Sequence, residues 1–492
     1  MHTRLQLIRN NINIINSVFV ICVLFITLTS PGYSWSQAKA ALSIEQPSNS
    51  TLTNSPSAFC DTVSEIPTLE CEALELLYSN TDGSNWINDT NWLVSNTPCT
   101  WFGVQCTAGY VTNLALNGNQ LQGTIPPQLG NLSQLNHLSF YLNQLSGNIP
   151  SELGGLSNLT WLDLNDNQLT GSIPASIGNL TNLSVLRVGN NQLSGSIPSE
   201  LGNLTNLQHL WLHGNLLSGS IPAELGNLTN VQKLWLYDNQ LSGNIPVELG
   251  NLSNLIVLYL DRNQLSGPIP SQLGNLGSLV RMSLFNNQLS GSIPTSLASL
   301  SNLEYLWLDG NQLNGNIPVE LGTLVNLIEI GLHDNLFTGS IPTSLGNLSN
   351  LKYLWLNNNQ LTGAIPTEFG NLSSLVSLRL NENQLSGSIQ SELGSLTDLQ
   401  QLWLEGNQLS ESIPSQMGSL TAMQDLRVSD NLISGLLPFT LSNLNDLQVF
   451  WFDNTQVCEP DDVDYQAWLA GIPDLQRTDV VCRLIRLPLV TR

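Results

Sequence analysis

Basic residues are scarce in this chain. Only 14 of its 492 residues are Lys or Arg, against 37 Asp or Glu, so the formal net charge is −23. Binding to nucleic acid requires a positive patch that neutralises phosphates, and an anionic bilayer would repel this chain in the same way. The composition therefore argues against both as partners, and the acidity is expected mainly to keep the protein soluble.

Catalytic and cofactor motifs are also missing. The sequence has no CxxC pair, no phosphate loop of the GxxxxGK[ST] or GxGxxG type, and five histidines that stand alone. No nucleophile, base and orienting group can be matched by spacing, and no segment outside the repeats described below is large enough for a catalytic domain. We therefore expect no enzyme, no cofactor and no metal site.

Long apolar runs are absent except near the N-terminus. Residues 18–28 form an apolar stretch of 11 residues that follows Arg4 and Arg9. This is too short for a confident membrane span, and Ala38-Lys39-Ala40 offers a signal-peptidase site. Residues 1–40 are therefore either a cleaved signal peptide or an uncleaved anchor, which would be the only contact with a membrane. Both place the rest of the chain outside the cytoplasm, secreted or on the cell surface.

The dominant feature of the sequence is an internal repeat. Asparagines recur every 24 residues without an insertion or deletion, from Asn119 through Asn143 and onward to Asn431. Around each of them runs the pattern LxxLxLxxNxLxGxIPxxLGNL; residues 207–228, for example, read LQHLWLHGNLLSGSIPAELGNL. Fourteen full copies and a partial fifteenth, residues 447–452, are present. The period, with Gly and Pro in almost every copy, excludes the common helical repeats.

Each part of the repeat has a structural task. In the LxLx part, Leu210 and Leu212 point inward from a short strand while Trp211 and His213 point outward. Stacking successive coils joins these strands into a parallel sheet. The asparagine closes a tight bend and bonds its backbone groups, the next glycine permits an unusual backbone conformation, and the proline fixes φ. The LGNL part is expected to return as a 3₁₀ turn on the convex side.

The ends of the chain are expected to cap the stack. Residues 41–59 are rich in Ser, Thr and Pro and are interpreted as a linker, residues 60–110 as the N-terminal cap, residues 111–452 as the repeats and residues 453–492 as the C-terminal cap and tail. A short helix is expected within residues 461–470. Outside the N-terminal segment, six cysteines lie beside the repeats in local groups, which predicts three disulfides: Cys60 with Cys71, Cys99 with Cys106, and Cys458 with Cys482. The absence of a CxxC pair argues against a zinc site.

The LxGxIPxxLGNL extension resembles the plant-type subclass of leucine-rich repeats, as in receptor-kinase ectodomains and polygalacturonase-inhibiting proteins. The preceding segment, with Glu70-Cys71-Glu72-Ala73-Leu74, Trp86, Trp92 and Cys99-Thr-Trp-Phe-Gly-Val-Gln-Cys106, is similar to the N-terminal cap of that class. The resemblance implies an α/β solenoid: a right-handed arc with a parallel β-sheet on its concave face, short 3₁₀ or loop segments on its convex side, and disulfide-containing caps. It also implies recognition of proteins, peptides or wall glycans. Because no kinase domain is present, signalling by the chain itself is not expected.

Aromatic residues recur at one variable position of the repeat. Six of the twelve tryptophans occupy the outward position between the two strand leucines. A row of exposed rings usually marks a binding site, although rings on adjacent strands can also stabilise a sheet by packing together. We predict a ligand-binding face made by Trp161, Trp211, His213, Trp235, Tyr237, Tyr259, Trp307, Trp355, Arg379, Trp403, Arg427 and Trp451.

Three functions follow from this face. The favoured one is a recognition scaffold for an extracellular protein or peptide. The alternatives are a module that binds cell-wall polysaccharide and a structural surface adhesin in which the solenoid is a spacer. Four aspartates in distant coils, Asp163, Asp261, Asp309 and Asp453, are expected to be solvated charges.

Overall fold

The structure, a computed structural model, describes residues 58–478 and 480–482. Contacts divide the chain into two units between Ser55 and Pro56, and all described residues belong to the second. The expected signal or anchor segment, nearly all of the linker and the tail at residues 483–492 lie outside the described residues.

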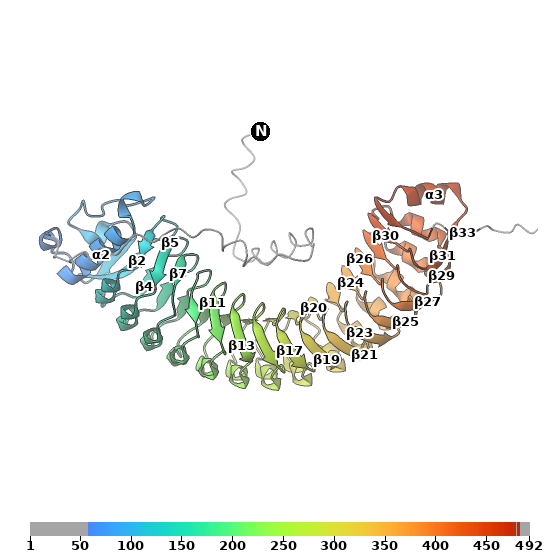
Figure 1. Ribbon diagram of the computed structural model, residues 1–492, viewed down its shortest axis with the longest axis horizontal. Helices are drawn as coiled ribbons and strands as arrows, with labels where there is room; N and C mark the ends of the chain where they lie inside the picture. Colours follow the sequence, from blue (N-terminus) through green and yellow to red (C-terminus); the bar gives the residue numbers. More distant parts are fainter. Residues whose placement is uncertain (1–57, 479, 483–492) are drawn as a thin grey trace, which may run out of the picture. The chain divides into compact units, whose positions relative to one another are not determined.

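A 17-stranded sheet runs through the second unit and lines the inner side of its curve (Figure 1). Its first two strands are antiparallel, and every later strand is parallel to the one before it with partners near 24 residues apart. The strands are β1 (Val104–Thr107), β2 (Tyr110–Ala115), β4 (His137–Ser139), β6 (Trp161–Asp163), β8 (Val185–Arg187), β10 (His209–Trp211), β12 (Lys233–Trp235), β14 (Val257–Tyr259), β16 (Arg281–Ser283), β18 (Tyr305–Trp307), β20 (Glu329–Gly331), β22 (Tyr353–Trp355), β24 (Ser377–Arg379), β26 (Gln401–Trp403), β28 (Asp425–Arg427), β30 (Val449–Trp451) and β32 (Asp474–Gln476).

A second set of short strands follows the asparagine bend of each coil and forms three further sheets. The first sheet holds β3 (Gln122–Thr124), β5 (Gln144–Asn148) and β7 (Gln168–Thr170). The longest holds β9 (Ser194–Gly195), β11 (Leu216–Gly219), β13 (Gln240–Asn244), β15 (Gln264–Gly267), β17 (Gln288–Gly291), β19 (Gln312–Asn316), β21 (Leu336–Ser340), β23 (Gln360–Gly363), β25 (Gln384–Ser388) and β27 (Gln408–Ser410). The last holds β29 (Ser434–Leu436), β31 (Gln456–Pro460) and β33 (Val481–Cys482).

One 3₁₀ turn per coil forms the outer side, as the LGNL pattern predicts (Figure 1). A proline precedes nearly every turn; Pro222, for instance, has φ −64° and ψ 134°, which sets the direction in which the turn begins. The turns are η6 (Pro127–Asn131), η7 (Ser151–Gly155), η8 (Ala175–Asn179), η9 (Ser199–Asn203), η10 (Ala223–Asn227), η11 (Val247–Asn251), η12 (Ser271–Asn275), η13 (Thr295–Ser299), η14 (Val319–Thr323), η15 (Thr343–Asn347), η16 (Thr367–Asn371), η17 (Ser391–Ser395), η18 (Ser415–Ser419) and η19 (Phe439–Asn443).

The repeated asparagine joins neighbouring coils as well as closing its own bend. Asn239 donates through Nδ2 to the carbonyls of Leu236 and Leu212, both at 3.1 Å, and its Oδ1 accepts from the backbone N–H of Leu217 at 3.1 Å. Because Leu212 and Leu217 belong to the preceding coil, the side chain satisfies backbone groups of two coils at once. The strand leucines beneath are fully buried, and each contributes about 1.5–3 kcal/mol.

Both ends of the stack are closed by caps. The N-terminal cap contains the 3₁₀ turns η3 (Cys60–Thr62), η4 (Gly83–Asn85) and η5 (Pro98–Thr100) and the helix α2 (Thr68–Asn80). The C-terminal cap contains the helix α3 (Val463–Ala470), which begins where Asp462 accepts a hydrogen bond from the N–H of Tyr465. All three predicted disulfides are formed. Among the described residues, no helix has the length and apolarity to cross a membrane.

Candidate ligand-binding face

Aromatic and arginine side chains stack along the N-terminal half of the concave sheet. Arg187 lies with its guanidinium carbon 3.8 Å from the ring centroid of Trp211 and 4.7 Å from that of Trp161. Trp211 and Trp235 stack at 4.1 Å with their planes 6° apart, and Tyr259 follows Trp235 at 5.8 Å. We call these five residues the N-terminal ladder.

A second ladder occupies the C-terminal half, where tryptophan and arginine alternate through Trp355, Arg379, Trp403, Arg427 and Trp451. Arg379 lies 3.9 Å from the ring centroid of Trp403, and Arg427 lies 4.1 Å from Trp403 and 3.9 Å from Trp451. Such cation–π pairs are worth about 0.5–2 kcal/mol each, depending on solvent access. We call these five residues the C-terminal ladder.

The ladders change the expectation that the predicted rings face solvent freely. Most members are partly buried, because the faces of their rings lie against the next member. Two of the predicted residues are buried outright: Tyr259 is 6% exposed and His213 is 4% exposed. His213 stacks on Tyr237 at 4.6 Å and lies over Gly189, where an added Cβ would approach its ring to 2.5 Å. Because Gly189 has no side chain, the imidazole ring of His213 can pack directly against the backbone there.

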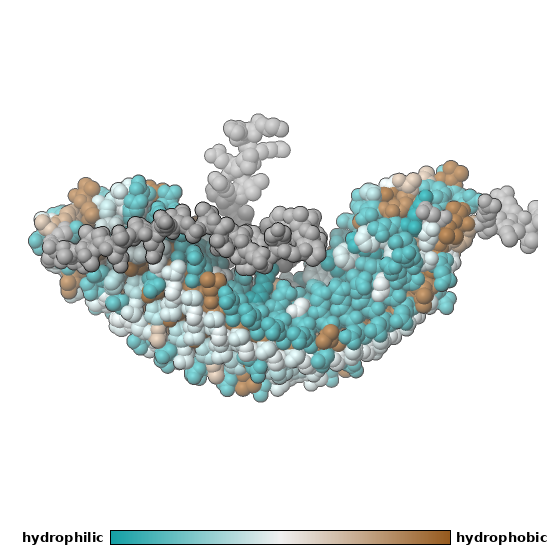
Figure 2. Space-filling view, viewed as in Figure 1, coloured by the Kyte–Doolittle hydropathy of each residue, from teal (hydrophilic) through white to brown (hydrophobic). Residues whose placement is uncertain are grey.

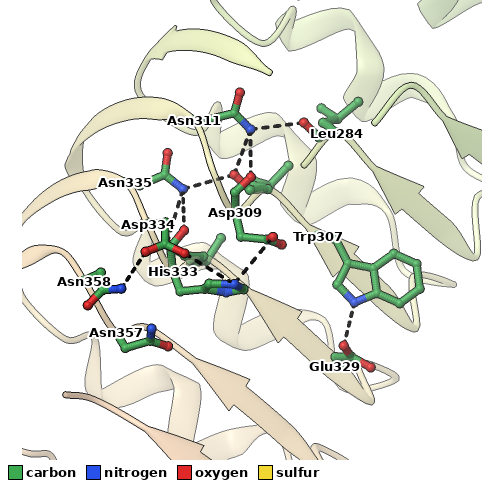
Figure 3. Close-up of polar contacts among 12 residues, drawn as sticks. Leu284, Trp307, Asp309, Asn311, Glu329, His333, Asp334, Asn335, Asn357 and Asn358 are labelled. Carbon is green, nitrogen blue, oxygen red and sulfur yellow. Dashed lines mark hydrogen bonds and ion pairs between the residues drawn. The ribbon is translucent and has the colours of Figure 1, made fainter. Parts of the chain in front are cut away.

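Trp307 lies between the two ladders and is held differently. Its neighbours at the same position of the adjoining coils are small, Ser283 and Gly331. The indole Nε1 donates to Glu329 Oε1 at 2.7 Å (Figure 3), and Tyr305 makes a tilted ring contact at 5.3 Å. Trp307 is therefore oriented by a hydrogen bond rather than by a stacked ladder neighbour.

Half-buried carboxylates lie beside Trp307. Asp309 Oδ2 is 3.5 Å from His333 Nε2 (Figure 3). Burial raises the pKa of Asp309 to about 8, with nearby Asp334 and Asp261 adding to the rise, while burial lowers the pKa of His333. Both groups are therefore expected to be uncharged near pH 7. Each of them presents a polar but neutral surface to a ligand.

The expectation that the concave aspartates are solvated charges is wrong for Asp309 and for two others. Asp163 is 6% exposed and Asp261 is 5% exposed. Asp163 lies 3.4 Å from Arg187, and Asp261 accepts a hydrogen bond from Ser283 Oγ at 2.7 Å, so protein groups replace water around both carboxylates. Burial raises the pKa of Asp261 to about 6. No group of three or more His, Cys, Asp or Glu in residues 58–478 and 480–482 is arranged to hold a metal ion.

Unpaired polar atoms gather on this same face. In the part of the chain that the structure describes, eleven buried side-chain nitrogen or oxygen atoms have no hydrogen-bond partner, and ten belong to concave-face positions. Each such atom costs about 1–3 kcal/mol unless water or a ligand pairs it. The ten are Nε1 of Trp211, Trp235, Trp403 and Trp451, Nε of Arg187 and Arg379, Nδ1 of His213 and His333, Oδ1 of Asn381 and Oε2 of Glu405.

Three family models of this repeat match the chain. The model "Leucine-rich repeat region" matches residues 111–241, "Leucine rich repeat" matches residues 325–385, and "Leucine Rich Repeat" matches residues 254–276, 278–300, 302–324 and 398–420. The chain belongs to the leucine-rich-repeat family.

Solved leucine-rich-repeat structures from plants and bacteria are similar to it. The plant peptide hormone receptor RGFR1, solved in complex with RGF2, is 32% identical over 74% of this chain and 66% of its own, with a TM-score of 0.64. The Arabidopsis receptor kinase HAESA, solved with the peptide hormone IDA and the co-receptor SERK1, is 28% identical over 82% and 85%, with a TM-score of 0.53. A leucine-rich-repeat protein of Leptospira interrogans is 32% identical over 72% and 88%, with a TM-score of 0.59.

The leucine-rich-repeat fold places the twelve predicted binding residues on strands of the 17-stranded sheet or two residues after them. It gathers most of them into the two ladders and leaves Trp307 between. It also adds residues that the sequence argument did not select: Arg187 in the N-terminal ladder, and Asn381 and Glu405 beside the C-terminal ladder. Arg187 occupies the outward position between the two strand leucines, so the repeat pattern could have identified it. Asn381 and Glu405 stand out only because one oxygen atom of each is buried without a hydrogen-bond partner, and the repeat pattern does not show which atoms are buried.

Proposed function

We propose that this leucine-rich-repeat protein is a non-catalytic extracellular recognition scaffold that binds a protein or an extended peptide along its concave face. The ten buried polar atoms without partners carry the proposal, because their cost is offset if a bound chain pairs some of them directly or through water. Trp, Tyr and Arg, which form the ladders, are the residue types that dominate binding energy at protein interfaces.

Two further observations support this proposal. RGFR1, a plant peptide hormone receptor, was solved in complex with RGF2, and HAESA was solved with the peptide hormone IDA; each shares the repeat with this chain. The three disulfides close the caps, and disulfides persist chiefly in oxidising compartments outside the cytoplasm. An extracellular peptide or protein is therefore the favoured partner.

The covered faces of the ladder rings argue against the polysaccharide alternative. A sugar stacks on the open face of an aromatic ring, but Trp211 and Trp235 occupy one another's faces, and Trp403 lies between two arginines. The ring edges and flanking polar groups are left for contact, which suits a peptide backbone better than a pyranose ring. A spacer role gives no reason for the unpaired polar atoms to collect on one face.

Selection of peptides on the full chain tests the proposal. A random-peptide display library is enriched on the wild-type protein, and the dissociation constants of the enriched peptides are measured by isothermal titration. Replacing Trp307→Ala together with Trp355→Ala removes two partly buried rings from the centre of the face, and affinity is expected to fall at least about tenfold. Soluble cell-wall polysaccharides are titrated in parallel.

The matched control removes a ring elsewhere. Phe439 is 50% exposed in the outer turn η19, so Phe439→Ala should leave affinity within about twofold. Thermal unfolding of each variant confirms that the fold persists. Equal loss in the control and the double variant, or saturable binding of polysaccharides alone, would contradict the proposal.

A further inference from the structure

A strip of carboxylates borders the C-terminal ladder. The second and third positions after each concave strand carry six acidic residues from the coil of β18 onward and, among the described residues, no Lys or Arg. We call this surface the acidic strip: Asp309, Asp334, Glu382, Glu405, Asp430 and Asp453. Three members, Asp334, Glu382 and Asp430, are exposed. These three exposed members make one margin of the C-terminal half of the concave face negative.

The ladder arginines next to the strip are already engaged. Arg427 donates to both oxygens of Asp425, through Nε at 2.8 Å and Nη2 at 2.9 Å. Arg379 donates through Nη2 to Gln401 Oε1 at 3.1 Å and lies against the ring of Trp403. Neither makes an ion pair within 4 Å of a strip carboxylate. The exposed strip carboxylates therefore keep negative charge that these two arginines do not pair.

Two hydrogen-bond acceptors in consecutive coils of this region have no partner. Asn381 is 8% exposed, and its Oδ1 is buried without a hydrogen bond; Glu405 Oε2, at the equivalent position of the next coil, is likewise buried and unpaired. The two coils are held together where the N–H of Glu382 donates to the carbonyl of Glu405 at 2.9 Å. The Glu382 carboxylate lies over Gly406, where an added Cβ would be 2.8 Å from Oε1. Asn381 Oδ1 and Glu405 Oε2 are thus buried acceptors without a donor, and the exposed Glu382 carboxylate lies beside them.

The raised pKa of Glu405 also indicates that this carboxylate lacks a positively charged partner among the described residues. Burial raises the pKa of Glu405 to about 7, and repulsion from Asp425 and Glu382 adds to the rise, while Arg427 opposes it. A positive group held against this carboxylate would stabilise its ionised form. Water would satisfy the acceptors but would not neutralise the strip.

Building on the proposed function, we propose that the part of the acidic strip around Asn381, Glu382 and Glu405 binds a lysine or arginine side chain of the peptide partner. Both side chains carry only donors and a full positive charge, which matches a set of acceptors that includes two carboxylates. The adjoining C-terminal ladder would contact the flanking residues of the same peptide. The partner is accordingly a basic peptide or a basic segment of a protein.

Labelled octa-arginine is the probe for this inference. Its dissociation constant for the full chain is measured by fluorescence anisotropy at about 150 mM salt, where long-range attraction is largely screened. Glu382→Gln with Glu405→Gln keeps the side-chain shapes and removes two charges, and affinity should fall at least about tenfold. Asn381→Leu removes an acceptor without a change of charge and should also weaken binding.

The control removes the same charge from the convex side. Glu224 and Glu248 are exposed in the outer turns η10 and η11, so Glu224→Gln with Glu248→Gln should change affinity less than twofold. Equal weakening by both double variants would mean that octa-arginine is attracted only by overall acidity, and no weakening by the strip variant would mean that the acceptors bind water alone; either result overturns the inference. Selected peptides that still require Trp307 and Trp355 would then leave the proposed function standing.

Discussion

At the scale of the residue, the concave sheet alters the chemistry of its own side chains. The sequence does not distinguish Asp309 from a surface aspartate. In the fold, however, its pKa rises to about 8, because its carboxylate is removed from water and lies near other carboxylates. The rise means that ionisation is unfavourable in the folded state. The free energy of unfolding therefore includes a contribution from the neutral form of Asp309. This contribution is fully present below the unfolded pKa, near 4, and is lost as the pH rises through the folded pKa.

Replacing Asp309→Asn removes this titration. We expect the stability of the variant relative to the wild type to rise with pH up to about 8, by roughly 4 kcal/mol between pH 5 and pH 9, because each unit of pKa shift is worth about 1.4 kcal/mol. Denaturant unfolding at pH 5 and pH 9 measures the difference. The exposed residue Asp446 supplies the control, and Asp446→Asn should change stability little at either pH. A constant difference between Asp309→Asn and wild type at both pH values would contradict the burial argument.

At the scale of the element, single departures from the repeat show what each position requires. Every coil except one has proline before its 3₁₀ turn; the exception is Gln390, which keeps φ −72° and ψ 131°. Likewise, Glu411 occupies a position that is glycine in the other coils and has φ +65°. Stacking against neighbouring coils therefore imposes the backbone of the repeat even on residues that do not favour it.

Gln390→Pro is expected to stabilise the protein by about 0.4–1 kcal/mol, because proline already has the required φ and reduces the entropy of the unfolded chain. The fold asks for no N–H at this position, since proline supplies none in the other coils. The reverse change in a regular coil, Pro222→Gln, should destabilise by a similar amount. Both are measured by chemical denaturation, and a loss of stability in Gln390→Pro would show that the Gln390 side chain has a role of its own.

At the scale of the whole molecule, each coil contacts its neighbours and the caps close the ends. Figure 2 shows the outer surface of the repeats in mainly hydrophilic and neutral colours, with hydrophobic atoms in small separate groups. On the face shown, the apolar core is therefore covered by the stacked coils themselves. In such a solenoid, stability is a sum of local interfaces. Damage to one cap should therefore spread inward only gradually.

Removing the last disulfide with Cys458→Ala and Cys482→Ala should loosen the C-terminal coils first. Loss of a cross-link of this loop length costs about 3 kcal/mol, and amide hydrogen exchange should quicken in β28, β30 and β32 while β4 to β10 stay protected. Cys60→Ala with Cys71→Ala is the mirror control and should loosen the N-terminal end. Uniform loss of protection along the sheet would show instead that all coils unfold as one cooperative unit.

The architecture could be predicted from the sequence alone, because a repeat of 24 residues can bury the leucines of every coil only if the coils stack. The alternation within each strand then indicates which residues point outward. The sequence also placed Trp403 and Arg427 on the concave face and paired the six cap cysteines. Three properties come only from the packing of the coils: the ladder rings cover one another, Asp261 and His213 are buried, and Asn381 Oδ1 and Glu405 Oε2 lack hydrogen-bond partners. These properties depend on side chains 24 residues apart coming within a few ångströms, and their packing is set by ring orientation and small neighbours such as Gly189 and Gly331.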